Sequence, residues 1–416
     1  MADPFPKDPA GSTVALVLAG GRGSRLDPLT AARSKPAVPF AGQYRLIDVV
    51  LSNLAHSGLK DVWIAEQYRP FTLNQHLAGG RPWDLDGTRH GLRILPPAEG
   101  REEEGFSAGN GHALAQQVPI LRSFGAERVV VLSADHLYQL DLRPVLAAHA
   151  DSGAELTMVT TVTDEDPSRF GVVQADEDGA VTAYDYKPEA PEGRLVATEV
   201  FVFDVAALHE VVAELVAREK AAGEHADGEE DEDGDPVASS LGDYGETIIP
   251  AFVGRGRVRE HRLEGYWRDI GTLDAFYRAH MELLDGAGLD LAAPGWPLLT
   301  NPPAAPPARV WPHAEVSNAL LSPGCVVKGT VEDSVLGPGV VVERGAHVRR
   351  SVLFGECIVP RGARLDAVIA DVGAHIPAEA VGRSRPGPGN LTVLTPATRD
   401  PDSEDETTGG AAAKDG

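Results

Sequence analysis

Short apolar runs alternate with helix-length amphipathic segments from Val14 to about Leu284. The runs with the length of a strand are 14–18, 62–65, 128–132, 156–162, 171–174 and 200–203. The segments with helical periodicity are 45–56, 69–77, 111–121, 142–149 and 206–218. This alternation predicts an α/β domain in which a mostly parallel sheet carries helices on both faces. In such a sheet, ligands bind beyond the carboxyl ends of the strands.

A different pattern follows residue 312. Apolar residues recur every six positions at Leu336, Val342, Val348 and Phe354, and Val372 has the same phase. A second apolar position lies four residues further on, at Val340, Ala346, Val352, Ile358 and Ile376. Glycine and proline fill the gaps between these positions. A six-residue period predicts a parallel β-helix, in which each short strand forms one side of a triangular coil.

Composition divides the rest of the chain. Residues 286–312 are rich in proline and alanine and predict a linker between the two domains. We expect a disordered leader over 1–12, an acidic surface insertion over 222–238 and a disordered acidic tail over 383–416. The α/β domain is therefore predicted over 13–285 and the β-helix domain over 313–382.

Charge and composition exclude several classes of protein. The formal charge of −25 at pH 7 argues against a nucleic-acid binder, because phosphate backbones attract basic surfaces. The chain has no stretch of about 18 apolar residues that could span a membrane. Its first residues lack the features of a signal peptide, which predicts a cytoplasmic protein. Two cysteines, Cys325 and Cys357, predict small buried side chains and no disulfide framework.

The apolar run 14–18 leads into a glycine-rich loop. Residues Leu18 to Leu26 read LAGGRGSRL, and Lys35 follows nine residues later in SKPAVPF. Backbone N–H groups of such a loop can surround phosphate oxygens, and Arg25 and Lys35 add the positive charge that a triphosphate requires. The loop matches neither GxxxxGK[ST] nor GxGxxG, because Leu26 stands at the third glycine. A flexible turn would explain the glycines alone, whereas Arg25 and Lys35 favour a nucleotide site.

Two acidic residues complete a candidate reaction centre. Asp135 follows the run 129–132 in VVVLSADHLY, where a carboxylate can hold a Mg²⁺ ion that bridges phosphates. The alternative is that Asp135 caps the next helix. The second acid, Asp269, lies in GYWRDIGT. Two carboxylates far apart in sequence, together with a phosphate loop, suit magnesium-assisted nucleotidyl transfer.

The motifs together resemble the glucose-1-phosphate adenylyltransferases of bacteria, also called ADP-glucose pyrophosphorylases. They are LAGGRGSRL, SKPAVPFAGQYRLIDVVLSNL, EQYRPFTLNQHL, SADHLY, FGVV, YKP, DYGETIIP and YWRDIGT, in that family's order over about 13–382. Among the sugar-phosphate nucleotidyltransferases, the motifs YRLIDVVLSN and YWRDIGT indicate this family in particular. The resemblance implies a Rossmann-like nucleotidyltransferase domain followed by a left-handed parallel β-helix of hexapeptide repeats.

The resemblance also implies an activity and the residues that perform it. The reaction forms ADP-glucose and pyrophosphate from ATP and glucose 1-phosphate, for glycogen or α-glucan synthesis. Arg25 and Lys35 would be catalytic residues on the β- and γ-phosphates, while Asp135 and Asp269 hold Mg²⁺. The implied nucleotide-binding residues are Leu18, Ala19, Gly20, Gly21, Gly23, Ser24, Glu99, Gly109, Asn110 and Asp135. The sugar phosphate is assigned to Gly171, Tyr186, Lys187 and Glu199. A homo-oligomer, in this family a tetramer, is implied, with no nucleic-acid or membrane partner.

Several positions in the substrate region depart from the family pattern. Glu99 and Gly100 replace two glutamines, and the loop around Asn110 and His112 is closer to that of N-acetylglucosamine-1-phosphate uridylyltransferases. Tyr186 replaces a glutamate before Lys187, a carboxylate enters at Glu199, and Ala32 replaces a lysine associated with activators. Such changes can alter substrate preference by orders of magnitude.

Three other functions therefore remain open at this point. One is transfer to another substrate pair, such as UTP with an amino-sugar phosphate. A second is a non-catalytic regulatory subunit, although the presence of Arg25, Lys35, Asp135 and Asp269 argues against it. The third is acyl transfer by the β-helix, which offers His313, His347 and His375.

Overall fold

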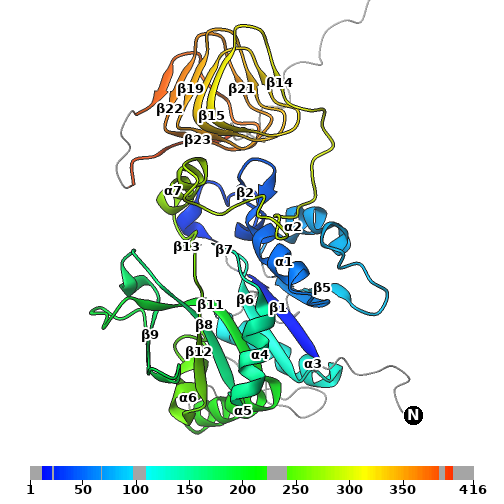
Figure 1. Ribbon diagram of the computed structural model, residues 1–416, viewed down its shortest axis with the longest axis vertical. Helices are drawn as coiled ribbons and strands as arrows, with labels where there is room; N and C mark the ends of the chain where they lie inside the picture. The colour runs from blue at the N-terminus through cyan, green and yellow to red at the C-terminus, as the bar shows by residue number, and fades with distance from the viewer. Residues whose placement is uncertain are drawn as a thin grey trace, which may run out of the picture. The chain divides into compact units, whose positions relative to one another are not determined.

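The computed structural model describes residues 12–20, 23–66, 68–96, 109–222, 241–383 and 389–396. Gly21, Glu99, the expected leader except residue 12, and the acidic insertion except residue 222 lie outside these described residues. The chain divides into two compact units, with the boundary after Pro302 (Figure 1). None of the helices in the described ranges is long and apolar enough to cross a membrane.

The first unit is built around one mixed sheet. Its parallel part has the strand order β6 (Arg128–Ser133), β1 (Thr13–Ala19), β4 (Asp61–Glu66) and β5 (Gly91–Leu95). The antiparallel strand β11 (Leu195–Asp204) joins β6 to β8 (Leu156–Val162), β9 (Gly171–Ala175), β10 (Val181–Tyr186) and β12 (Val258–Arg262). No α-helix separates β8 from β11, so these strands can pair without the helical crossover that parallel neighbours need.

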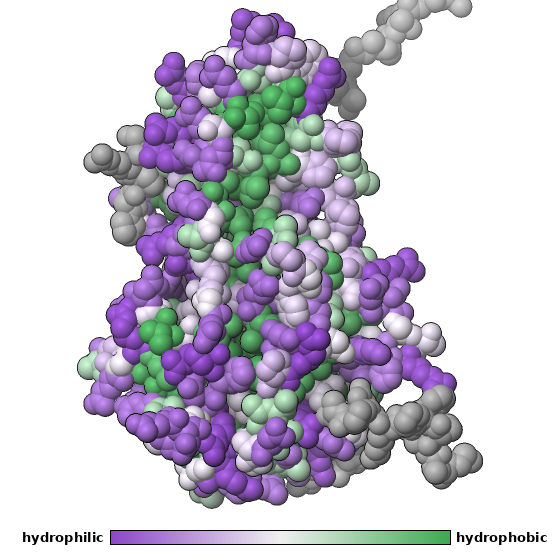
Figure 2. All heavy atoms as spheres, viewed as in Figure 1, coloured by the Kyte–Doolittle hydropathy of each residue, from purple (hydrophilic) through white to green (hydrophobic). Residues whose placement is uncertain are grey.

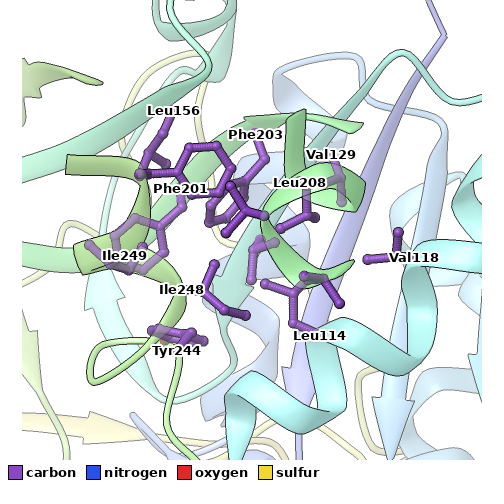
Figure 3. Close-up of a cluster of buried hydrophobic side chains, with 14 of the residues drawn as sticks. Leu114, Val118, Val129, Leu156, Phe201, Phe203, Leu208, Tyr244, Ile248 and Ile249 are labelled. Atoms are coloured by element: carbon purple, nitrogen blue, oxygen red, sulfur yellow. The ribbon is translucent and has the colours of Figure 1, made fainter. Parts of the chain in front are cut away.

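Helices cover both faces of this sheet. They are α1 (Leu46–His56), α2 (Pro70–Leu77), α3 (Asn110–Phe124), α4 (Leu142–Ser152), α5 (Val205–Ala222), α6 (Ile248–Arg255) and α7 (Leu273–Leu284). Alternate residues of β1 face opposite cores: Leu16 packs with α3, α5 and α6, whereas Val17 packs with α1, α2 and α4. Figure 3 shows the first of these cores, in which Phe201 and Phe203 of β11 lie among aliphatic residues. The predicted strands and helices of this domain and its α/β class are confirmed.

Small elements position the carboxyl edge of the sheet. Strands β7 (His136–Tyr138) and β13 (Trp267–Asp269) form an antiparallel pair, and β2 (Pro39–Phe40) pairs with β3 (Tyr44–Arg45). Short 3₁₀ turns cover Ser24–Leu26, Lys35–Ala37, Ala78–Trp83 and Pro167–Arg169. Buried Asn53 of α1 donates to the Tyr138 carbonyl (3.0 Å) and accepts from the Leu140 amide (3.2 Å), which fixes β7 against α1.

The second unit is a parallel β-helix, as predicted. Its strands are β14 (Arg309–Val310), β15 (Glu315–Leu321), β16 (Val326–Val327), β17 (Thr330–Leu336), β18 (Val341–Val342), β19 (His347–Arg349), β20 (Val352–Leu353), β21 (Ile358–Val359), β22 (Arg364–Asp366), β23 (Val368–Ala370), β24 (Ala380–Gly382) and β25 (Thr392–Leu394). Val331, Val348 and Leu365 stack in one buried ladder. Both cysteines are buried and free, as expected.

Ile358 is wrongly predicted as a core position, because it is 61% exposed. Its neighbours Cys357 and Val359 are fully buried. Side chains alternate between the two faces of a strand, so Ile358 has to point outward when both neighbours point inward. The other positions of the two six-residue series that we predict are buried, apart from half-buried Val372.

The expected domain boundaries also need correction. The linker 286–312 is divided between the two units: the Trp296 indole donates to Asn53 (2.9 Å) in the first, whereas β14 pairs with β16 in the second. Part of the tail that we expect to be disordered is structured: β25 pairs with β23, with Val393 opposite Ile369. Residues 384–388 and 397–416 of that tail lie outside the described part of the chain.

Buried histidines make the stability of the first unit sensitive to pH. In α7, His280 accepts a hydrogen bond from the Ala41 amide (3.1 Å) and donates to the Phe276 carbonyl (2.8 Å). Burial lowers the pKa of His280 to about 4, and burial likewise lowers that of His149 to about 4. Both rings are therefore neutral at pH 7. A histidine of the unfolded chain titrates near pH ~6.5, so acidification favours unfolding.

We expect the free energy of unfolding to fall as the pH decreases from about 6.5 towards about 4. Between about pH 7 and about pH 5, His280 should account for about 2 kcal/mol of this fall, which His280→Gln should remove. Urea denaturation followed by tryptophan fluorescence measures the difference. His347→Gln, at an exposed position of β19, is the control and should retain the parental pH dependence. An unchanged pH dependence in His280→Gln would contradict the neutral buried state.

Candidate functional site

The glycine loop begins where β1 ends. Leu18 pairs with Ser133 of β6, and Ala19 pairs with Glu66 of β4, so the loop leaves the centre of the parallel strands. Gly23 has a left-handed φ of 68°, and a Cβ there would lie 3.0 Å from the Lys35 Cβ. Glycine is therefore required for the close approach of Lys35. The turn that follows is anchored by buried Leu26, while Ser24 and Arg25 remain exposed.

Lys35 and Asp135, which are one hundred residues apart, form a partly buried ion pair. Lys35 is 8% exposed, and the Ser133 hydroxyl also donates to the Asp135 carboxylate. Burial alone raises the pKa of Asp135, but the positive charges of Lys35 and His136 outweigh it and lower the pKa overall. Asp135 is thus ionised at neutral pH and ready to hold a cation.

The pairing register between β7 and β13 brings Asp269, the second acidic residue of the predicted reaction centre, close to Asp135. Asp269 lies directly opposite His136, the residue after Asp135. The Nε2 atom of His136 is 3.5 Å from Asp269 Oδ1 and 3.7 Å from Asp135 Oδ1. Within the described part of the chain, these three side chains can each offer one atom to a metal ion, all within 4.8 Å of one another. His136 lies in the motif SADHLY, but no local signal in the sequence indicates a role for it.

A chain of paired charges, most of them partly buried, supports Asp269. Arg169 lies 3.4 Å from Asp269 and 3.1 Å from Glu165. Arg268 is 6% exposed and also pairs with Glu165, while two of its nitrogens donate to Glu282 (2.9 and 2.7 Å). The planar guanidinium fixes both carboxylates at once. Arg268 therefore holds β13 in place next to Asp269.

Tyr186 and Lys187 form a second cluster with Asp243. Lys187 donates to the Tyr186 hydroxyl (2.5 Å), which in turn donates to Asp243 Oδ2 (2.8 Å). Lys187 Nζ also lies 4.0 Å from Asp243. Gly171 is needed beside this cluster because a Cβ there would lie 2.4 Å from the Tyr184 hydroxyl. Asp243 lies in the motif DYGETIIP, but no local signal in the sequence indicates a role for it.

Glu199 lies between the two clusters. It has a left-handed φ of 57° at a register shift of β11 between Ala197 and Val200, which turns its side chain out of the regular strand alternation. Its Oε2 is 4.0 Å from His136 Nε2. Burial and then the negative charges of Asp135 and Asp269 raise the pKa of Glu199, against the positive charges of His136 and Lys187.

Asn110 has a structural contact at the start of α3. Its side-chain oxygen accepts from the Tyr244 amide (2.8 Å), and a Cβ on Gly109 would lie 2.2 Å from the Gly242 carbonyl oxygen. Both residues thus support the segment that carries Asp243. The structure therefore brings Lys35, Asp135, Asp269 and Glu199 around His136, and Tyr186 and Lys187 around Asp243. Gly20 continues the β1 loop, and Gly21 and Glu99 lie outside the described residues.

Comparison with known proteins identifies two families of domains. Residues 14–286 match the nucleotidyl transferase family, and residues 306–385 match the GlmU-like C-terminal hexapeptide family. The chain is 38% identical to the glucose-1-phosphate adenylyltransferase of Thermotoga maritima over 82% of its length and 77% of the relative's. It is 38% identical to that of Thermomicrobium roseum over 79% of both chains. It is 35% identical to that of Clostridium beijerinckii, over 82% of this chain and 84% of the relative.

Arg268→Met tests whether the ion pairs of Arg268 stabilise the strand that carries Asp269. The substitution leaves Glu165 and Glu282 without their shared partner, so we expect the free energy of unfolding to fall by about 2 kcal/mol or more. Urea denaturation measures it. Arg143→Met, which removes an exposed pair with Asp141, should leave the midpoint unchanged. Equal stability of Arg268→Met and the parent would contradict the role assigned to Arg268.

Proposed function

The chain belongs to the glucose-1-phosphate adenylyltransferase family, and we propose that it transfers the adenylyl group of ATP to glucose 1-phosphate. The products are ADP-glucose, for glycogen or α-glucan synthesis, and pyrophosphate. One observation carries the proposal: Lys35, Asp135 and Asp269 converge at the carboxyl edge of the sheet, next to the glycine loop. This arrangement combines a cradle for phosphates with carboxylates for a divalent cation.

We assign the triphosphate to the loop after β1. We assign it to the backbone of Leu18, Ala19, Gly20, Gly23 and Ser24, and to Gly21, which lies outside the described residues. Exposed Arg25 and buried Lys35 bind the β- and γ-phosphates. The charge of Lys35 is paired with the carboxylate of Asp135. With a nucleotide bound, Lys35 stabilises the negative charge that develops on the departing pyrophosphate. Gly109, Asn110 and Glu99 are proposed to border the rest of the nucleotide.

We assign Mg²⁺ to Asp135 and Asp269. The donors fit this ion, because carboxylate oxygens are its preferred protein ligands and both groups face one point. When bound there, Mg²⁺ neutralises phosphate charge. Asp135, with its lowered pKa, keeps its negative charge for this purpose throughout the neutral pH range.

The sugar phosphate is assigned to the cluster of Gly171, Tyr186 and Lys187, with Glu199 beside it. Lys187 is exposed and provides the positive charge for the phosphate group. One oxygen of this phosphate attacks the α-phosphorus of ATP, a new P–O bond forms, and the bond to pyrophosphate breaks. The attacking oxygen is already ionised at pH 7, so no general base is needed and catalysis is positioning and charge stabilisation.

We propose that the protein is a homo-oligomer, specifically a tetramer, assembled through its β-helix. Hexapeptide repeats favour self-association, and Val310, Val316 and Ile358 are exposed apolar residues of this domain. Hydrophobic residues gather on the β-helix on the face shown in Figure 2, with polar residues beside them. The cytoplasmic location expected from the N-terminal residues stays a prediction.

A matrix of substrates tests the proposed reaction directly. ATP, UTP, GTP, CTP and dTTP are each combined with glucose 1-phosphate, N-acetylglucosamine 1-phosphate and mannose 1-phosphate, and pyrophosphate and nucleotide sugar are measured. We expect clear preference for ATP with glucose 1-phosphate. Preference for UTP with the amino-sugar phosphate would replace the proposed substrates, and no product from any pair would favour a regulatory subunit.

Single substitutions test the assigned roles. Lys35→Ala, Asp135→Asn and Asp269→Asn should each lower kcat by about a hundredfold or more, the scale of losing one key electrostatic contact. The matched controls are Lys328→Ala, in the β-helix, and Asp290→Asn, on an exposed turn, which should retain parental activity. Near-parental turnover by Asp135→Asn would contradict its assignment to the metal.

A further inference from the structure

His136 is a buried imidazole whose position the proposed reaction leaves unexplained. Its side chain is 5% exposed and lies between Asp135, Asp269 and Glu199. The ring of Trp267 packs against it edge to face, with centroids 5.4 Å apart. These contacts hold the ring in one orientation at the centre of the carboxylates.

The hydrogen bond of the His136 ring shows which of its two nitrogens carries a proton and which one has a lone pair. The Nδ1 atom lies 3.0 Å from the Thr198 carbonyl oxygen. A carbonyl only accepts hydrogen bonds, so Nδ1 carries the proton and donates it. In the neutral ring, Nε2 then has a lone pair directed towards carboxylate oxygens. This arrangement is unfavourable unless a positive charge lies between them, which either a proton on Nε2 or a metal ion can supply. An N–H···O=C bond on the far nitrogen is also the usual way in which proteins orient a histidine that binds a metal.

The distances favour a metal ion over a shared proton. The Nε2 atom is 3.5 Å from Asp269 Oδ1, 3.7 Å from Asp135 Oδ1 and 4.0 Å from Glu199 Oε2. An N–H···O hydrogen bond is about 2.7–3.2 Å long. Two ligands bound at about 2.1 Å and at right angles are about 3 Å apart, and wider angles separate them further. The nearer two carboxylates are therefore spaced as ligands of one ion.

We propose that His136, through Nε2, is a third protein ligand of the divalent cation held by Asp135 and Asp269. This inference rests on the metal assignment of the proposed function. A nitrogen ligand changes which cations the site prefers: imidazole is a ligand of first-row transition metals, whereas Mg²⁺ takes oxygen ligands. The site should accordingly bind Mn²⁺ more tightly than an all-oxygen site would, and His136 should account for the difference.

Pulsed electron paramagnetic resonance of the full chain with Mn²⁺ alone tests the proposal. Electron spin-echo envelope modulation should show ¹⁴N coupling from a coordinated imidazole. His136→Gln should abolish this coupling and weaken Mn²⁺ binding about tenfold, with a smaller effect on Mg²⁺ in competition. His149→Gln replaces another buried histidine, which hydrogen-bonds Thr157 (2.8 Å), and should leave the coupling intact. The spectrum of the parental protein gives an answer even if His136→Gln does not fold.

Asp269→Asn separates this inference from the proposed metal site. If Asp269→Asn loses Mn²⁺ whereas the parent shows no ¹⁴N coupling, the metal site stands and the role of His136 is overturned. If Asp269→Asn binds Mn²⁺ like the parent, the metal assignment itself fails and the inference fails with it. Loss of binding in Asp269→Asn, together with loss of ¹⁴N coupling in His136→Gln, supports both.

Discussion

The site depends on the repulsion between carboxylates that the fold forces together. Asp135, Glu199 and Asp269, all partly buried, surround one buried imidazole. Such charges are stable in the folded protein only if cations accompany them. Lys35 and Arg169 partly meet this need. The same demand for positive charge makes the site suitable for a divalent cation and, through it, for the phosphates of a nucleotide.

Backbone geometry, more than side-chain choice, brings these groups together. The parallel order of β1 and β6 places the glycine loop next to the residue that precedes β7, and the β7–β13 pair then delivers Asp269. The register shift in β11 turns Glu199 towards His136. Left-handed backbone at Glu199 is unusual for a residue with a side chain and is tolerated where the surrounding strands determine it. Several regular elements thus determine one irregular site.

The residues that we propose for the sugar phosphate differ from the family pattern but keep a similar balance of charge. Tyr186 occupies the position where the family has a glutamate, yet its hydroxyl joins Lys187 to the carboxylate of Asp243. Glu199 adds a second carboxylate from a different strand. The negative charge near Lys187 is therefore kept, but it comes from other positions than that of the family's glutamate.

The sequence by itself determined the α/β domain and the β-helix, and it indicated the residues that we propose for phosphate and metal binding, because each has a local signal. Hydrophobic periodicity indicates buried faces, and the glycine loop with Arg25 and Lys35 indicates a phosphate site. The single wrong phase, at Ile358, arose where one strand turned a different face inward. Tertiary structure alone decided that His136 faces Asp269, that Asn110 supports the segment of Asp243, and that β25 joins β23. These contacts join residues that are distant in sequence. Strand pairing sets the first and the last, and the packing of an irregular segment against the start of α3 sets the second.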